Sequence, residues 1–445
     1  MNKVGLVSLG CSKNLVDSEM MLGILREQGY ILEDDPAQAD VLIVNTCGFI
    51  DSAKQESIDT ILEMAGYKET GRCRTLVVAG CLSQRYRQEI LEEIPEIDLV
   101  LGTADYHRIA DILRQKTRRT FGDINCSPDY TVLPRVNSMP PYTAYLKIAD
   151  GCDNRCTYCV IPSIRGRYRS RGMDELVAEA ASLAASGVRE LIVIAQDTTG
   201  YGTDLYGAPR LAELLVRLCE IPPLRWVRLH YGYPEGMTEE LLEVMAAQEK
   251  ICPYFDIPIQ HCSDTILKRM GRRCTKAELT RLFADIRQKM PDAVLRTSLI
   301  AGFPGETEEQ FGELCEFVEK VGFDRVGVFA YSQEEGTPAA RLKGQIDEAV
   351  KEARRDRLME LQKDISLAKN RAKLGRTFET LVEGFDTGQC LYYGRTYADS
   401  VEIDGRIYFG SGAELSAGMF VPVIAEDCDA YDLYGRAKIE GGGLI

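Results

Sequence analysis

Three cysteines lie within eight residues in the stretch Asp150-Gly-Cys-Asp-Asn-Arg-Cys-Thr-Tyr-Cys, at Cys152, Cys156 and Cys159. Iron–sulfur clusters are held by cysteine thiolates, usually one for each of four irons. A triplet with no evident fourth ligand therefore leaves one iron open, and an open iron is a place to bind a substrate. The spacing Cys-x3-Cys-x2-Cys predicts a cluster site that takes part in chemistry.

Two other interpretations of the triplet stay open at this point. A structural zinc site needs four ligands in paired knuckles, and neither a second Cys-x2-Cys nor a histidine stands near these three cysteines. Free cysteines also pack in cores, but these lie beside Asp153, Asn154 and Arg155, which is typical of a polar loop.

The composition favours a large reduced enzyme. A chain of 445 residues has room for roughly three domains with ample cores. Its 15 cysteines are an odd number without a secretory signal, which favours metal ligation or burial over a disulfide framework. The apolar run at 4–9 is too short for a signal-peptide core, and no stretch approaches the roughly 18 apolar residues of a membrane span. We therefore expect a cytoplasmic protein with no membrane partner.

The first segment reads as repeated strand–helix units. Three aliphatic runs, at 3–9, 40–45 and 74–79, each precede a helical pattern, which is typical of a parallel sheet covered on both faces. A cysteine follows each run, at Cys11, Cys47 and Cys81, with glycines at positions 10, 48 and 80 beside them. The carboxyl ends of parallel strands form the ligand crevice of such sheets, so these cysteines predict a second cluster site. The alternative is that each is simply a small apolar residue at a strand end.

A proline-rich stretch separates this segment from the next. Prolines at 128, 134, 140 and 141 suit a linker, because proline lacks a donor and restricts the preceding residue. From about Tyr142, six strand patterns alternate with amphipathic runs, at 142–148, 190–195, 225–231, 254–259, 294–300 and 325–329. We expect an α/β partial (βα)6 TIM barrel, with the cysteine triplet in the loop after its first strand, on the rim where barrel enzymes place their chemistry.

Polar side chains at other strand ends of this barrel are candidates for contact with a nucleoside or an acceptor. Each can equally be a loop side chain with ordinary partners, and His230 or His261 more often serves structure than catalysis. Gly302 lets a ligand approach the backbone, and Thr307 is placed to cap the helix that follows. The polar candidates at these ends are Gln196, Asp197, Thr198, His230, Gln260 and His261.

The run Ile164-Arg-Gly-Arg-Tyr-Arg-Ser-Arg carries alternating arginines just after the triplet. In an extended segment Arg165, Arg167 and Arg169 would project to one side, because side chains repeat every two residues. Pairing with the many carboxylates of the chain is an equally good interpretation.

The last segment differs from the first two. Residues 346–373 read as a charged helix, and short alternating runs at 377–384, 391–398, 401–408 and 420–426 then predict a small antiparallel β-barrel, OB-like in kind. Residues 371–445 carry 7 basic and 12 acidic side chains, and the whole chain has a formal charge of −15. Nucleic-acid binding relies on Lys and Arg, so a basic protein partner fits this surface better than RNA does.

Taken together, these motifs resemble the radical S-adenosylmethionine (radical SAM) methylthiotransferase family. The resemblance rests on Leu9-Gly-Cys-Ser-Lys-Asn-Leu, Asn45-Thr-Cys-Gly-Phe-Ile, Ala79-Gly-Cys-Leu-Ser-Gln-Arg-Tyr and the triplet with Val160-Ile-Pro-Ser-Ile-Arg-Gly. It implies an N-terminal methylthiotransferase domain at 1–136, a radical SAM barrel at 137–370 and a C-terminal TRAM barrel at 371–440. Pro258-Ile-Gln-His-Cys-Ser-Asp and the residues after the first two cysteines look more like the members that modify ribosomal protein S12 than those that modify tRNA.

The resemblance also implies the cofactors and their ligands. Cys152, Cys156 and Cys159 would hold the [4Fe–4S] cluster that cleaves S-adenosylmethionine, and Cys11, Cys47 and Cys81 an auxiliary [4Fe–4S] cluster that presents sulfur. A methylthio group would then replace a hydrogen on the β-carbon of an aspartyl residue of S12; the alternative acceptor is a tRNA adenosine. The cofactors carry this chemistry and the protein positions them, so no side-chain acid or base is assigned. The residues expected near S-adenosylmethionine are Tyr158, Gln196, Asp197, Gln260, His261 and Gly302.

The remaining expectations concern partners. We expect a monomer that receives electrons from a donor the sequence does not identify, and we expect RNA not to be its main contact. The source of the sulfur, and whether free S12 or the assembled small subunit is the acceptor, are not encoded in any motif of the chain.

Overall fold

The computed structural model of the chain describes residues 2–130 and 133–438. They form two compact units. Unit 1 contains residues up to Leu183, together with Val193–Arg210 and Ser332–Arg341; unit 2 contains Ala184–Ile192, Leu211–Tyr331 and the chain from Leu342. No described helix is long and apolar enough to cross a membrane.

Unit 1 begins with the predicted parallel sheet, and this prediction is confirmed. Its strand order is β2-β1-β3-β4-β5-β6, so the three cysteine-bearing strands β1 (Lys3–Ser8), β3 (Val41–Thr46) and β4 (Thr75–Gly80) are neighbours. The short strands β2 (Ile31–Leu32), β5 (Leu99–Leu101) and β6 (Arg119–Thr120) were not predicted. Their two or three residues are too few to show a period.

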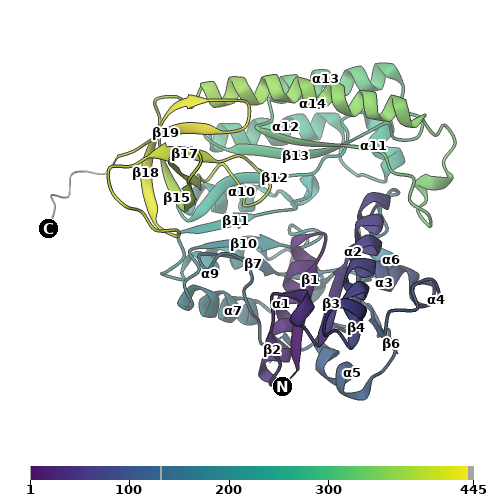
Figure 1. The fold of residues 1–445 in the computed structure, drawn as a ribbon. Coiled ribbons are helices and arrows are strands. Elements are labelled where there is room, and N and C mark those ends of the chain that lie inside the picture. Colours follow the sequence, from purple (N-terminus) through teal and green to yellow (C-terminus); the bar gives the residue numbers. More distant parts are fainter. Residues whose placement is uncertain (1, 131–132, 439–445) are drawn as a thin grey trace. The chain divides into compact units, whose positions relative to one another are not determined.

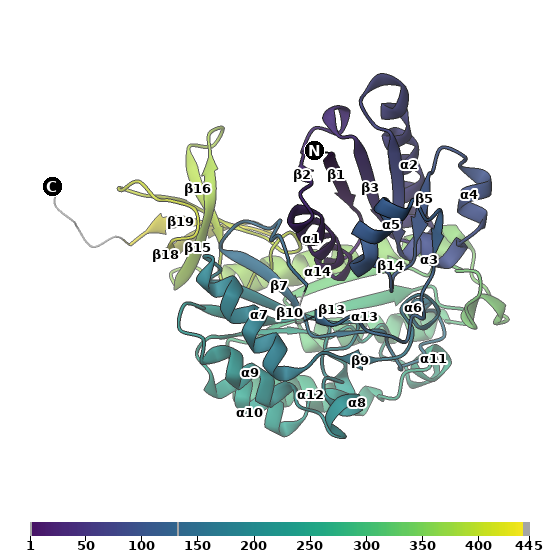
Figure 2. The same ribbon diagram turned by 90° about the horizontal axis from the view of Figure 1, so that it is seen from below.

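Helices cover both faces of this sheet. Helix α2 (Asp51–Thr70) packs Ile61 and Met64 against Leu42 and Val44 of β3. Asn45 of β3 points to the opposite face, because side chains alternate along a strand, and there it donates to Ser18 of helix α1 (Ser12–Glu27). Figure 2 shows α1 and α2 on opposite sides of β1 and β3. The other helices here are α3 (Cys81–Tyr86), α4 (Glu89–Glu93) and α5 (Ile109–Gln115).

Unit 1 also carries the loop of the cysteine triplet. Strand β7 (Thr143–Lys147) precedes it, and Ile148 N–H donates to the carbonyl of Ile194 over 3.0 Å. The triplet lies between β8 (Ala149–Asp150) and α6 (Ile161–Arg165), and β9 (Arg169–Ser170) pairs with β8. Helix α8 (Thr203–Tyr206) completes the helices of this unit, while α7 (Met173–Ala185) ends at its border.

The other five predicted barrel strands are confirmed as β10 (Glu190–Ile194), β11 (Trp226–Leu229), β12 (Ile251–Asp256), β13 (Val294–Ala301) and β14 (Arg325–Ala330). Neighbouring strands follow chain order, and the register of β11 to β14 is parallel. The helices between them are α9 (Leu211–Cys219), α10 (Glu239–Ala247), α11 (Asp264–Met270), α12 (Lys276–Lys289) and α13 (Glu308–Val321). Thr307 caps α13 as predicted, accepting from the N–H of Gln310.

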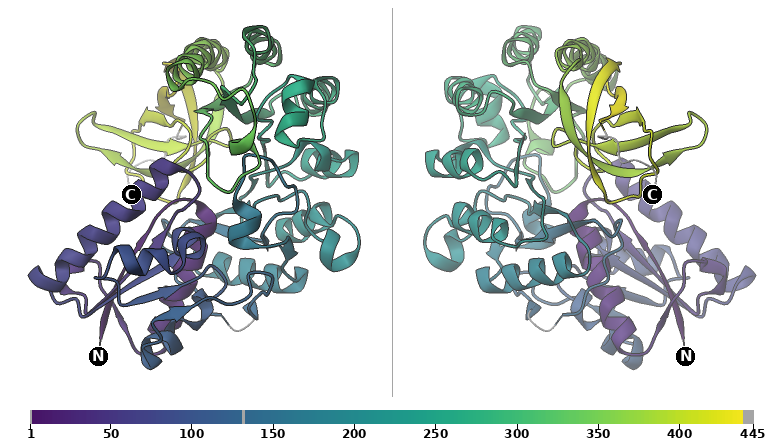
Figure 3. Two further views of the ribbon diagram at one scale, coloured as in Figure 1. Left: turned by 90° about the vertical axis from the view of Figure 1, so that its right-hand side faces the viewer. Right: turned by 90° about the vertical axis from the view of Figure 1, so that its left-hand side faces the viewer.

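The last part of unit 2 is a helix followed by a small barrel. Helix α14 (Glu348–Arg371) lies along α13 (Figure 1), and it also contacts β14. The closed barrel has the order β15-β16-β17-β19-β18 and appears beside α14 in Figure 3. Its strands are β15 (Thr377–Asp386), β16 (Leu391–Arg395), β17 (Ile407–Gly410), β18 (Phe420–Cys428) and β19 (Leu433–Ala437).

The prediction of a strand over 401–408 is wrong for most of its length, because β17 begins only at Ile407. The 396–405 segment instead forms turns whose polar groups meet buried barrel side chains of the same unit. Arg228 donates to the Tyr397 carbonyl over 2.7 Å, and the Tyr254 hydroxyl donates to Asp404 over 2.6 Å. The first bond satisfies a backbone carbonyl and the second a carboxylate, so the turns are held by side chains of the larger barrel.

Candidate functional site

The three N-terminal cysteines gather at one edge of the sheet, as the strand order requires. Cys11 lies at the start of α1, Cys47 directly follows β3, and Cys81 opens α3. At Gly10, whose φ is +87°, an added Cβ would lie 2.7 Å from the Cβ of Cys47 and 3.0 Å from its sulfur. Only glycine therefore lets the Cys11 loop approach Cys47 this closely. We refer to Cys11, Cys47 and Cys81 as the N-terminal trio.

The electrostatics of the trio agree with this proximity. Burial raises the pKa of the Cys81 thiol to about 12, and charge on Cys11 and Cys47 contributes to the rise. Burial also raises the pKa of the Cys47 thiol, with a further contribution from Cys11. The side chains are close enough for each charge to disfavour the next, which is how thiols behave when no metal shares their charge.

Asn14 of α1 fixes the loops that carry this trio. Its side-chain amide donates to the carbonyl of Leu9 over 2.9 Å and to that of Thr46 over 3.0 Å. Asn45 returns a bond to the carbonyl of Asn14 over 2.9 Å. One buried side chain therefore joins the residues that lead into Cys11 and Cys47.

The cysteine triplet forms a tight loop of its own. Cys159 N–H donates to the carbonyl of Cys156 over 3.0 Å, and Ile161 N–H lies 3.4 Å from the Cys159 sulfur. The Asn154 amide lies 3.6 Å from the Cys152 sulfur. Burial raises the pKa of the Cys152 thiol to about 11 and that of Cys159 to about 12, and charge on Cys156 contributes to both. N–H donors already point at sulfurs, which is the surrounding that cluster thiolates need.

Both groups of thiols fit iron–sulfur clusters by the chemistry of their donors. Each offers three soft sulfur ligands beside glycines or backbone N–H groups. The raised pKa values of the Cys47, Cys81, Cys152 and Cys159 thiols mean that cluster binding would release protons. Ser12, next to Cys11, has a buried hydroxyl oxygen without a hydrogen-bond partner among the described residues. Within residues 2–130 and 133–438, no three His, Cys, Asp or Glu side chains are arranged as ligands of a single metal ion.

A buried charge cluster lies between the two groups of thiols. Arg165 of α6 donates to Asp17 of α1 over 2.8 Å and to Asp150 over 3.2 Å, and Lys147 pairs with the same two carboxylates. Burial alone would raise the pKa of Asp150, but Lys147 and Arg165 hold it well below its usual range. We call Asp17, Lys147, Asp150 and Arg165 the charge quartet. It has two charges of each sign.

The quartet corrects one interpretation of the sequence. Arg165 does not lie in an extended segment with Arg167 and Arg169; it ends helix α6, which begins at Ile161 with Pro162 in its first turn. Its side chain is buried, whereas Arg167 is exposed. The alternative, pairing with carboxylates, holds for Arg165. Asn14, Asp17 and Lys147 were not identified from sequence, because single polar residues in a helix or strand carry no spacing signal.

Three of the residues predicted to bind the cofactor lie in unit 1 with the triplet. Tyr158 lies between two of its cysteines. Gln196 donates to Asp150 over 3.2 Å, while its side-chain carbonyl oxygen is buried without a hydrogen-bond partner among the described residues. Asp197 accepts from Asn154 over 2.7 Å and from Thr199 over 2.6 Å. Its carboxylate thereby orients the residue that touches Cys152.

The other three candidates lie in unit 2. His261 is fully buried; its Nδ1 accepts from Ser263 N–H over 2.9 Å and its Nε2 lies 3.1 Å from Glu306. Glu306 also accepts from the N–H of Gly302 over 2.5 Å. Gln260 has a φ of +70° and pairs as a bridge with Leu299. For these six residues, contact with S-adenosylmethionine stays a prediction.

The 332–341 segment of unit 1 contacts both cysteine regions. Glu334 accepts from Asp51 N–H over 2.9 Å and pairs with Lys54 and Arg85 over 3.1 and 3.0 Å. Ala339 N–H donates over 2.9 Å to the carbonyl of Thr157, inside the triplet. The segment therefore connects the triplet loop with helices α2 and α3, which follow Cys47 and begin at Cys81.

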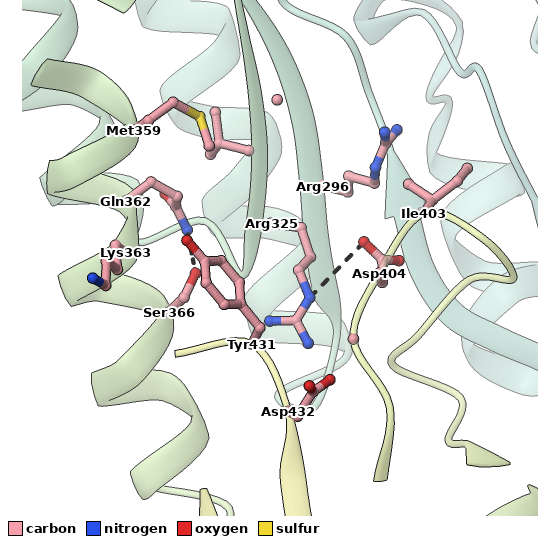
Figure 4. A pocket seen from close by; sticks show the side chains of 13 residues that line it. Arg296, Arg325, Met359, Gln362, Lys363, Ser366, Ile403, Asp404, Tyr431 and Asp432 are labelled. Atoms are coloured by element: carbon pink, nitrogen blue, oxygen red, sulfur yellow. Dashed lines mark hydrogen bonds and ion pairs between the residues drawn. The ribbon is translucent and has the colours of Figure 1, made fainter. Parts of the chain in front are cut away.

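Unit 2 has a cavity of about 370 Å³ between β13, β14, α14 and the barrel loops. Figure 4 shows Arg325 and Asp404, which pair over 3.9 Å, on its wall. Arg296, Gln362 and Asp432 also line it. The predicted residues Gln260, His261 and Gly302 do not belong to its lining.

Comparison with known families divides the chain into three parts. Residues 3–102 match the uncharacterized protein family UPF0004, residues 146–318 the radical SAM superfamily, and residues 374–437 the TRAM domain. Each match lies within one of the three predicted domains, whose exact bounds stay a prediction.

Solved structures agree with this fold. The radical S-adenosylmethionine methyltransferase TsrM from Kitasatospora setae is similar with a TM-score of 0.58 and 16% identity, over 76% of this chain and 77% of that one. The cobalamin-dependent radical enzyme OxsB is similar with a TM-score of 0.53 and 13% identity, over 82% of this chain and 56% of that one. At such identities the likeness concerns the fold alone. Fold and cysteine motif together define a radical SAM enzyme, a class that binds S-adenosylmethionine and a [4Fe–4S] cluster.

Curated relatives narrow this class. The ribosomal protein uS12 methylthiotransferase RimO of Clostridioides difficile is 52% identical over 99% of this chain and 100% of its own length. That of Pelotomaculum thermopropionicum is 52% identical over 98% and 99%, and that of Geobacter sulfurreducens 50% identical over 98% of both. The chain belongs to the RimO family of ribosomal protein uS12 methylthiotransferases.

Proposed function

We propose that this protein is an S-adenosylmethionine-dependent methylthiotransferase that places a methylthio group on the β-carbon of an aspartyl residue of ribosomal protein uS12. The observation that carries the proposal is the gathering of two separate thiol trios within unit 1, in a chain about half identical to RimO proteins along its whole length. A tRNA adenosine is the less favoured acceptor, since residues 371–445 are acidic.

The chain's own residues would divide the work between two sites. Cys152, Cys156 and Cys159 would hold the radical SAM cluster, and Cys11, Cys47 and Cys81 the auxiliary one. When bound, these groups supply the electron that cleaves S-adenosylmethionine to a 5′-deoxyadenosyl radical and the sulfur that enters the product. An unactivated C–H bond needs such a radical, because side-chain bases cannot deprotonate it.

The surroundings of the triplet would orient the cofactor. Tyr158, Gln196 and Asp197 lie on the same unit as the triplet, and the free carbonyl oxygen of Gln196 can accept from an amino or hydroxyl group of S-adenosylmethionine. We also propose Gln260, His261 and Gly302 of unit 2 as residues that contact S-adenosylmethionine. His261 would act by holding Glu306 and the Gly302 loop, because both of its ring nitrogens are engaged.

We propose three domains at 1–136, 137–370 and 371–440, the last of which would meet the basic substrate through its carboxylates. Both trios belong to one unit of a single chain, which supports a monomeric enzyme. We place the enzyme in the cytoplasm, where an electron donor yet to be identified would reduce it. Free uS12 and the assembled small subunit are both accessible acceptors there.

The test is an anaerobic reaction of reconstituted enzyme with S-adenosylmethionine, dithionite and either purified uS12 or tRNA. Mass spectrometry of the products should show a methylthio group on one uS12 aspartyl residue and unchanged tRNA nucleosides. The triple variant C152A/C156A/C159A serves as the control and should modify neither. Methylthiolated adenosine with unmodified uS12 would reverse the assignment.

A further inference from the structure

Arg165 has a position that its ion pairs alone do not explain. Its side chain is 1% exposed, and one guanidinium nitrogen, Nη1, contacts the carboxylates of Asp17 and Asp150. The other nitrogen, Nη2, turns away from them: it donates to the side-chain oxygen of Asn14 over 2.8 Å and lies 3.8 Å from the sulfur of Cys81. A buried arginine therefore points a charged N–H group at one member of the N-terminal trio.

The same arginine belongs to the segment of the other group of thiols. It lies six residues after Cys159, at the end of α6. Val160 and Ile164 of this segment pack against Cys81, and the carbonyl of Ile164 accepts from the Thr103 hydroxyl over 2.7 Å. Backbone and side chain are thus both fixed, so the position of the charge beside Cys81 is set by the triplet loop.

The charges around this N–H group indicate its effect on the reduction potential of a cluster. The quartet is neutral as a whole, with Lys147 and Arg165 facing Asp17 and Asp150. Of the two cations, Arg165 is the one with a hydrogen bond to a Cys81 sulfur. Hydrogen bonds to cluster sulfurs and local net charge are two of the factors that set the reduction potential of an iron–sulfur cluster. A cation at this point favours the reduced, more negative form.

We propose that Arg165 is a positioning residue that couples the two cysteine groups and makes the cluster on Cys11, Cys47 and Cys81 easier to reduce than a neutral side chain would. This inference rests on the proposed function, because it requires the auxiliary cluster. Asn14 supports it by holding Nη2 in place while it ties the loops of Cys11 and Cys47.

The experiment isolates the auxiliary cluster in the full-length C152A/C156A/C159A variant, reconstituted with iron and sulfide without oxygen. Dithionite titration with redox mediators, followed by electron paramagnetic resonance, gives the midpoint potential. In this background R165Q should lower the ratio of reduced to oxidised cluster at a fixed potential at least tenfold, a shift of about 59 mV for one electron. R165K keeps the charge but loses the forked geometry, so it should shift the ratio less than R165Q does.

The matched control is R135Q. Arg135 is also buried and paired, with Glu19 and Glu179 over 2.6 and 2.7 Å, but among the described residues its side chain has no hydrogen bond to a cysteine. It should leave the potential unchanged. If R165Q matches the parent, or if R165K shifts as far as R165Q, the inference is wrong.

A second variant protects the test against poor folding of R165Q. D17N removes a carboxylate from the quartet and should move the potential in the opposite direction, toward easier reduction. An unchanged or lowered potential in D17N would overturn the inference. If C152A/C156A/C159A binds no iron or sulfide at all, the auxiliary cluster and with it the proposed function are refuted. If the cluster forms normally but R165Q does not move its potential, only the inference about Arg165 is refuted.

Discussion

Loss of the Glu190 charge on β10 should strongly destabilise unit 2. The Glu190 side chain is fully buried between two arginines: Arg228 donates to it over 2.9 Å, and Arg395 of the small barrel over 2.6 Å. Arg395 also pairs with Glu383 over 2.7 Å, which completes a buried group of two carboxylates and two arginines. The variant E190Q keeps the shape of the side chain and leaves one arginine charge uncompensated.

The cost follows from the charge. Removing one partner of a buried ion pair costs about 3–5 kcal/mol, because the other charge stays desolvated. The pKa of Glu190 gives a consistent figure. Burial would raise this pKa, yet Arg395 and Arg228 lower it from 4.5 to about 2. Since each pKa unit is worth about 1.4 kcal/mol, the ionised form is stabilised by about 3 kcal/mol on folding.

The downward direction of the Glu190 pKa shift fixes how stability depends on pH. A carboxyl whose folded-state pKa is depressed stabilises the fold above its unfolded-state pKa and loses that contribution as pH falls through the folded value. Between pH 4.5 and pH 2, the free energy of unfolding of the wild type should therefore fall by about 3 kcal/mol more than that of E190Q. Above pH 5 the difference between the two proteins should be constant.

Amide hydrogen exchange of β10, β11 and β16 measures this locally. A loss of about 3 kcal/mol should lower protection roughly 100-fold at neutral pH. The matched control is E379Q, which removes an exposed pair between β15 and Arg225 and should change protection less than about fivefold. Equal effects of E190Q and E379Q, or an E190Q effect that persists unchanged at pH 2, would refute the reasoning.

Two further substitutions test the cysteine region of unit 1. In G10A the added Cβ would lie 2.7 Å from the Cβ of Cys47, at a φ of +87°, so reconstituted protein should lose about half of its iron while the triplet cluster remains. In E334Q the carboxylate charge that pairs with Lys54 and Arg85 is removed. We expect the protection of backbone amides at the start of α2 against hydrogen exchange to fall about tenfold or more.

The substitutions G10A and E334Q each have a control variant within unit 1. Gly207 also has a positive φ, of +76°, but open space around its Cβ position, so G207A should keep the full iron content. Glu335 is exposed, and E335Q should leave α2 unchanged. Iron loss in G207A equal to that in G10A would show backbone strain rather than crowding at Cys47 to be the cause. An α2 that exchanges at the wild-type rate in E334Q would show that Glu334 does not hold this segment.

The strands that carry the cysteines could be predicted because both signals are local. β-branched runs mark β1, β3 and β4, and once they are parallel neighbours, the residues after them must meet at one edge. The cysteine triplet could be predicted as a cluster site from its spacing alone. The turns of the 396–405 segment were missed, since Val401 to Tyr408 alternates like a strand, and only the buried partners Arg228 and Tyr254, more than 100 residues away, decide otherwise.

The quartet was beyond sequence reasoning for the same reason. Asp17 lies in the middle of α1 and Lys147 at the end of β7, and neither position has a period or a neighbour that indicates a buried ion pair. The sequence singled out Arg165 for its alternation with Arg167, but a turn of helix that begins at Ile161 and contains Pro162 replaces the extended geometry. Long-range electrostatic partners become visible only when the fold has brought them together.

Iron and sulfide counts after oxygen-free reconstitution test the central claim most directly. Two [4Fe–4S] clusters predict about eight irons per wild-type chain. The variants C152A/C156A/C159A and C11A/C47A/C81A should each retain about four, with the loss confined to the site that was changed. A C11A/C47A/C81A variant that keeps the wild-type iron and sulfide content would contradict the account.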